Sequence, residues 1–131
     1  AIAKAFVVTG ISEALGAQLA ALTALPLLLM IVIVCLSVTF LTEITSNTAT
    51  TTLLMPILAA AALGANIELA LLMVPAALSA SCAFMMPVAT APNAIVFGTG
   101  EISVKRMSRE GLGLNLIGAV VISLSCYYLV A

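Results

Sequence analysis

Histidine and aspartate are absent from this chain of 131 residues, and charged side chains make up only 7% of it. Histidine is the commonest general base and the commonest transition-metal ligand, and aspartate would be needed for an aspartyl intramembrane protease. No nucleophile–base pair can be assembled from the remaining side chains, so an enzyme is not expected. The net charge of −1 offers no basic stripe to neutralise phosphates, which excludes a nucleic-acid partner.

Cysteine is scarce as well, with three residues in the chain. Cys35, Cys82 and Cys126 all lie in apolar runs, their number is odd, and no metal-binding spacing is present. We expect all three to be buried thiols.

Hydrophobic residues, by contrast, make up 64% of the chain, and its mean hydropathy is +1.35. A soluble domain carries about 25% charged residues. The stretches 14–42, 69–100 and 111–131 contain no charged side chain, and a spanning helix needs roughly 20 apolar residues. The composition therefore predicts an all-α membrane protein in a lipid bilayer.

A polar tip, Thr42–Thr52, lies between two apolar runs, and it organises the first half of the chain. Residues 1–22 are predicted to be the end of a preceding helix and an interfacial connector helix. Residues 23–63 then form an apolar helix, the polar tip and a return arm from about Ala49 to Leu63. This arm rises only ~22 Å against a hydrocarbon core of ~30 Å. The pattern predicts a re-entrant hairpin, in which protein or a wet cavity satisfies the polar groups.

A second irregular stretch, the proline motif Pro87-Val-Ala-Thr-Ala-Pro-Asn93, interrupts residues 69–98. Two prolines this close make a continuous helix unfavourable. We expect a helix from Leu69 to Met86, the motif, and a short stub from Ala94 to Phe97. Together they form a discontinuous transmembrane helix. Residues 111–130 are predicted to be the final transmembrane helix.

Orientation follows from the basic residues of the loop 99–110. Lys105, Arg106 and Arg109 should be cytoplasmic by the positive-inside rule. The turn at Gly64 and the C-terminus would then lie outside.

The polar tip and the proline motif each offer a helix C-terminus with free carbonyls and a helix N-terminus with free amides. Carbonyls and hydroxyls suit an alkali cation, whereas N-terminal amides suit an anion. Paired discontinuous helices that meet near the midplane are how secondary transporters bind a co-ion and an anionic substrate.

Ser46-Asn47-Thr48 in a hairpin tip, followed some forty residues later by Pro87–Asn93, resembles the divalent anion–sodium symporter family. Within it, the chain is similar to the bacterial sodium–dicarboxylate symporters of the INDY type. The resemblance implies one half of an inverted-repeat transporter, with the N-terminal repeat missing from this chain. It also implies a homodimer in the cell inner membrane that imports C4 dicarboxylates by elevator-type alternating access.

The resemblance further implies roles for particular positions. The positions that would bind sodium are Thr42, Thr45, Asn47 and Ala89. Those that would contact the dicarboxylate are Asn47, Thr48 and Thr90. The family often has Pro-Pro-Asn where this chain has Ala91-Pro92-Asn93, which should loosen the chain beside Thr90.

Other interpretations remain open at this stage. Hydroxyl side chains in membrane helices often bond back to their own helix, and Glu43 is expected to bond amides or hydroxyls across the tip rather than ligands. A passive anion channel on the same architecture is one alternative. A non-transporting assembly subunit, in which the polar tip merely packs helices, is another.

Overall fold

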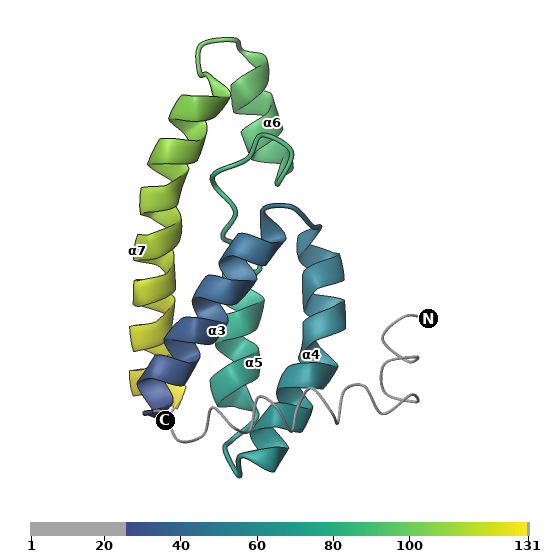
Figure 1. Cartoon of the computed structure of the whole chain (residues 1–131), viewed down its shortest axis with the longest axis vertical. Helices are drawn as coiled ribbons and strands as arrows, with labels where there is room; N and C mark the ends of the chain where they lie inside the picture. The colour runs from purple at the N-terminus through teal and green to yellow at the C-terminus, as the bar shows by residue number, and fades with distance from the viewer. Residues whose placement is uncertain (1–25, 131) are drawn as a thin grey trace.

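The computed structural model describes residues 26–130, which form five helices and, within that range, no strand (Figure 1). Residues 1–22, predicted to hold a helix end and a connector helix, lie outside the described residues. So do residues 23–25, where the first apolar helix was expected to begin.

Helices α3 (Leu27–Thr42) and α4 (Asn47–Gly64) form a hairpin closed by residues 43–46. Ser46 caps α4, because its hydroxyl accepts a hydrogen bond from the Ala49 amide at 3.1 Å. Helix α4 continues through Pro56 and ends at a turn where Asn66 has a φ of 56°. Asparagine tolerates this left-handed conformation better than most residues.

The next helix is shorter than its hydrophobic pattern predicts. Helix α5 covers Ala70–Ser79 and ends well before Met86, so the prediction of a helix to Met86 was wrong. Residues 80–90, here called the break, contain no helix and lead to α6 (Ala91–Gly98). Thr90 caps α6 by accepting a hydrogen bond from the Asn93 amide at 3.4 Å.

Helix α7 (Val104–Val130) begins at Val104 rather than at Gly111. The Ser103 hydroxyl accepts a hydrogen bond from the Arg106 amide at 3.3 Å, and the Ser103 carbonyl accepts one from the Met107 amide at 3.0 Å. Ser103 therefore acts as the N-cap of α7. Serine is a favoured N-cap residue, but the sequence analysis did not assign this role to Ser103. The basic residues therefore lie on the first turns of α7 and not in a loop.

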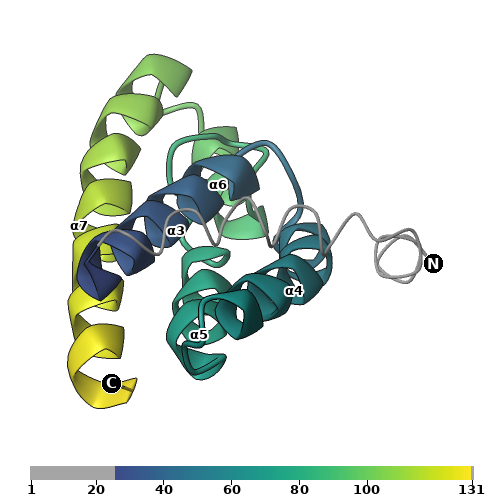
Figure 2. The ribbon, with the colours of Figure 1, turned by 60° about the horizontal axis from the view of Figure 1, so that its bottom comes forward.

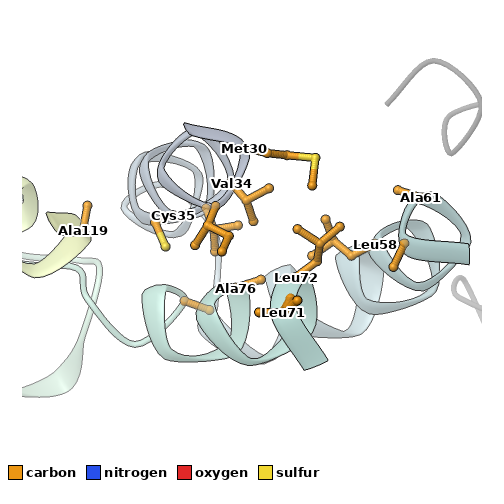
Figure 3. Close-up of a cluster of buried hydrophobic side chains, with 13 residues drawn as sticks. Met30, Val34, Cys35, Leu58, Ala61, Leu71, Leu72, Ala76 and Ala119 are labelled. Carbon is orange, nitrogen blue, oxygen red and sulfur yellow. The ribbon is translucent and has the colours of Figure 1, made fainter. Parts of the chain in front are cut away.

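Helix α3 packs against α5 and α7, and α4 packs mainly against α5. Figures 1 and 2 show α7 alongside α3, on the side away from α4. Figure 3 shows the core between these helices, where Met30 and Val34 of α3 face Leu72 of α5 and Cys35 lies on the side nearer Ala119. Cys35 and Cys126 are buried as predicted, whereas Cys82 is half-buried.

Two of the helices in the described range, α4 and α7, are long and apolar enough to cross a membrane. Helices α3 and α5 are apolar but shorter. Much of α7 exposes large hydrophobic side chains, among them Ile117, Val121 and Leu129. The helices therefore bury one apolar face against each other and leave a second one uncovered, as membrane helices do.

Candidate functional site

Thr42, the last residue of α3, lies where the hairpin meets the end of α5. Its side chain is fully buried, and its Oγ1 is 2.6 Å from Asn47 Oδ1 and 2.9 Å from the carbonyl oxygen of Ala80. A threonine hydroxyl has one hydrogen and can donate it to only one acceptor. Asn47 turns its Oδ1 toward Thr42. Three oxygens, Thr42 Oγ1, Asn47 Oδ1 and the Ala80 carbonyl oxygen, therefore share the single hydroxyl hydrogen of Thr42.

The other predicted residues of the hairpin have local partners. The Thr45 hydroxyl donates to the Leu41 carbonyl at 2.8 Å, and its Oγ1 is 2.6 Å from Thr50 Oγ1. Thr48 is exposed in the first turn of α4. The structure thus brings Thr42 and Asn47 together, while the Thr45 hydroxyl is bonded within the hairpin.

Ala89 and Thr90 lie at the end of the break, and both are half-buried. The Ala89 amide donates to the Met86 carbonyl at 3.2 Å, and the Thr90 hydroxyl caps α6. Among residues 26–130, no hydrogen bond joins either residue to Thr42, Asn47 or Thr48. Ala89 and Thr90 are instead linked to the hairpin indirectly, through hydrogen bonds that earlier residues of the break make with the hairpin.

Glu43 makes that connection. Its side chain is buried, with 4% of its surface exposed. Oε1 accepts hydrogen bonds from the amides of Phe84 and Met85 at 2.8 and 2.9 Å, and Oε2 accepts one from the Met86 amide at 3.0 Å. Glu43 was expected to bond amides or hydroxyls across the tip. It does bond amides, but those of the break.

These contacts explain why α5 ends early. Amides that donate to Glu43 are not available for the helical ladder, and the Ala80 carbonyl is already used by Thr42. Asn93 supports the break from the α6 side, because its Nδ2 donates to the carbonyls of Ala83 and Met86 at 2.8 and 3.0 Å. Side chains therefore provide hydrogen-bond partners for backbone amides and carbonyls of the break. Non-helical backbone within a membrane needs such partners.

Helix α7 supplies two further residues that the sequence analysis missed. Asn115 is fully buried and donates from Nδ2 to Glu43 Oε1 at 2.7 Å. A Cβ at Gly111 would lie 2.3 Å from the Phe84 carbonyl oxygen, so only glycine fits there. Both residues lie on the same face of α7, one turn apart. An asparagine inside a long apolar run was the available signal for Asn115, because such a side chain needs a polar partner.

The site contains neutral oxygens close to one buried carboxylate. Within residues 26–130 no three His, Cys, Asp or Glu side chains gather to hold a metal ion. The uncharged group around Thr42 matches a weakly held monovalent cation better than a divalent one, which prefers several carboxylates.

Residues 26–130 are helical and apolar, and helix ends of the hairpin and of the break meet at a polar site, a feature found in secondary transporters. The chain matches the sodium:sulfate symporter transmembrane region over residues 1–129, and it belongs to this family. The family comprises membrane transporters and not enzymes, as the lack of catalytic groups predicted.

Relatives with high sequence identity carry more specific names. The sodium-dependent dicarboxylate transporter SdcS of Staphylococcus saprophyticus is 49% identical over 130 residues, which are 99% of this chain and 25% of that protein. The transporter of the same name from Staphylococcus aureus strain MRSA252 is 45% identical over 129 residues, 98% of this chain and 25% of that protein. The chain thus spans about a quarter of the length of these relatives. The resemblance to sodium–dicarboxylate symporters is confirmed at the level of the family.

Proposed function

We propose that these residues are part of a sodium-coupled secondary transporter that imports C4 dicarboxylates such as succinate. Family membership and the names of the two relatives support sodium and dicarboxylate as the transported species. The single observation that carries the proposal is the meeting of Thr42, Asn47 and Ala80 at hydrogen-bond distance with one hydrogen between them.

For sodium, we propose ligation by oxygen atoms of Thr42, Thr45, Asn47 and Ala89. In the observed orientation, the Asn47 amide presents Oδ1 to Thr42. The opposite orientation would place an N–H on Thr42 and satisfy the group without an ion. A bound cation therefore favours the orientation of Asn47 in which Oδ1 points at Thr42. Because Asn47 also contacts the substrate in this proposal, ion binding is coupled to the conformation of a substrate-binding side chain.

For the dicarboxylate, we propose contacts from Asn47, Thr48 and Thr90. Asn47 and Thr48 form the first turn of α4, and Thr90 caps α6. The first amides of a helix have no intrahelical acceptor and attract anions. At the start of α4 the first amides can donate to one carboxylate. At the start of α6, Pro92 has no N–H and the Asn93 amide donates to Thr90, so the Ala91 amide and the Thr90 hydroxyl are the donors for the other.

The larger architecture belongs to the same proposal. Helices α3 and α4 would form a re-entrant hairpin and α5 and α6 a discontinuous helix, within one half of an inverted repeat. The other repeat would be supplied by the rest of a transporter about four times as long, as the coverage of the relatives suggests. Homodimers in the inner membrane would move this unit by an elevator mechanism.

Uptake of labelled succinate into proteoliposomes tests the proposal, with the full-length transporter that contains these residues. We expect uptake to require an inward sodium gradient and Asn47→Ala to abolish most of it. Asn66→Gly is the matched control, because Asn66 lies at an exposed turn with positive φ, which glycine adopts freely.

Other outcomes would contradict the proposal. Uptake that ignores sodium, or that survives Asn47→Ala, would exclude a coupled site at the hairpin. Anion currents independent of a sodium gradient would indicate a passive channel. A thermal stability that sodium and succinate leave unchanged, together with no uptake, would indicate an assembly subunit.

A further inference from the structure

The amides of Phe84, Met85 and Met86 are consecutive, and all three point at one carboxylate. Successive backbone N–H groups that converge in this way form an anion-binding nest. In this chain the nest is occupied by Glu43, a residue of the hairpin that is 41 positions away from Phe84 in sequence. The break therefore carries an internal anion.

Helix α7 holds the same carboxylate from the other side. Asn115 Nδ2 donates to the oxygen that already accepts from Phe84 and Met85, and Asn115 Oδ1 has no hydrogen-bond partner among residues 26–130. The amide orientation of Asn115 is fixed, because an acceptor turned toward the carboxylate would be repelled. Within the described part of the chain, the hydrogen bond of this buried side chain is therefore directed at Glu43.

Close backbone packing completes the arrangement. Gly111 of α7 allows the Phe84 carbonyl and the Met85 Cα to lie within 3 Å of the point where a Cβ would be, at 2.3 and 2.8 Å. Thr42 fixes the start of the break at Ala80. The break is thus bonded to the hairpin at two residues, Thr42 and Glu43, and packs closely against α7.

We propose that Glu43 is a positioning residue for the transport site. By filling the nest at Phe84–Met86, it fixes the break against α3 and α7 and thereby sets where Ala89 and Thr90 lie relative to Asn47. The inference rests on the proposed function, since Ala89 and Thr90 enter it as the proposed sodium and substrate contacts. It assigns the nest to Glu43 and not to a carboxylate of the substrate.

The test replaces Glu43 by glutamine in the full-length transporter, with Glu68→Gln as the matched control. Glutamine has nearly the same size, but it directs an N–H group at one or more of the backbone amides. Glu68 is exposed at the turn between α4 and α5. The first readout is hydrogen–deuterium exchange of the peptide covering residues 80–90, which does not depend on transport. We expect amide exchange at Phe84–Met86 to become at least tenfold faster in Glu43→Gln and to stay unchanged in the control.

The second readout is the kinetics of uptake, normalised to folded protein. A positioning role raises KM for succinate and the sodium concentration for half-maximal uptake, by about tenfold, while Vmax per folded molecule falls less. A merely structural role lowers the amount of folded protein and leaves both constants unchanged. If Glu43→Gln does not fold, Asn115→Ala removes one of the four donors to Glu43, and the same changes should appear in smaller size.

Unchanged exchange at Phe84–Met86 overturns the proposal, and so does faster exchange with unchanged KM and sodium dependence. If the unsubstituted transporter shows no sodium-dependent uptake, the proposed function fails instead. The exchange data then still report whether Glu43 fills the nest.

Discussion

Glu43 and Gly111 both contact the break, and Asn115 donates a hydrogen bond to Glu43. A carboxylate buried in an apolar bundle needs several donors, and the break and α7 provide four of them. The break carries the donors of Phe84–Met86 and also runs close to α7. Glycine at position 111 makes that approach possible.

Gly111→Ala should destabilise the protein by about 1–3 kcal/mol, the usual cost of overpacking. The new Cβ would meet backbone atoms of Phe84 and Met85, which cannot rotate away as a side chain would. Gly113→Ala is the matched control, since a Cβ there would have nothing within 4 Å. The midpoints of thermal unfolding in detergent measure the stability of both variants. Equal midpoints for the two variants would contradict the close approach of α7 to the break.

Thr42→Val tests the oxygen group at the tip. Valine keeps the shape of threonine and removes the hydroxyl that lies between Asn47 and Ala80. We expect the sodium concentration for half-maximal uptake to rise about tenfold, which corresponds to about 1.4 kcal/mol. Thr52→Val is the control, because the exposed Thr52 hydroxyl donates only to the Thr48 carbonyl of its own helix. A sodium dependence unchanged by Thr42→Val would remove the Thr42 hydroxyl from the cation site.

Among the elements, the break differs most from its prediction. The proline motif indicated an interruption between residues 69 and 98, and an interruption is present. It begins at Ala80 and not at Pro87, however. Proline placement explains where α6 starts, with Pro92 in its first turn. It does not explain where α5 ends, because that depends on Thr42 and Glu43.

The N-terminal extension of α7 gives a test at the scale of elements. Ser108→Pro should destabilise the protein by about 3 kcal/mol, because proline inside a helix removes a hydrogen bond and clashes with the preceding turn. Val104→Pro should be tolerated, since Val104 is the first residue of α7 and proline suits that position. Thermal unfolding of the two variants would show no difference if residues 104–110 formed a loop.

At the scale of the whole molecule, charged side chains gather at one end of the bundle. Lys105, Arg106 and Arg109 are exposed at the start of α7, and Figure 1 shows the turn between α4 and α5 at the opposite end. The positive-inside rule predicts that the basic end lies in the cytoplasm. The C-terminal end of α7 would then lie outside.

Cysteine labelling in intact cells tests this orientation. In a full-length transporter with Cys35, Cys82 and Cys126 replaced by alanine, Glu68→Cys should react with an impermeant maleimide added from outside. Ser103→Cys should react only after the membrane is permeabilised. Both side chains are exposed, so reactivity reports on the side of the membrane. The reverse pattern of labelling would contradict the orientation.

The sequence alone determined the helical membrane class, the family and the positions of the two motifs, because hydrophobic run length, proline and hydroxyl clusters act locally. The family resemblance implied that Thr42 and Asn47 share a site, and in the structure their side chains are 2.6 Å apart. Tertiary structure decided the partner of Glu43, the end of α5 and the roles of Asn115 and Gly111. The hydrogen bonds of Glu43 to the break and to Asn115 join residues 41 to 72 positions apart, and no local pattern can reveal which buried amide or carboxylate a folded chain will bring together.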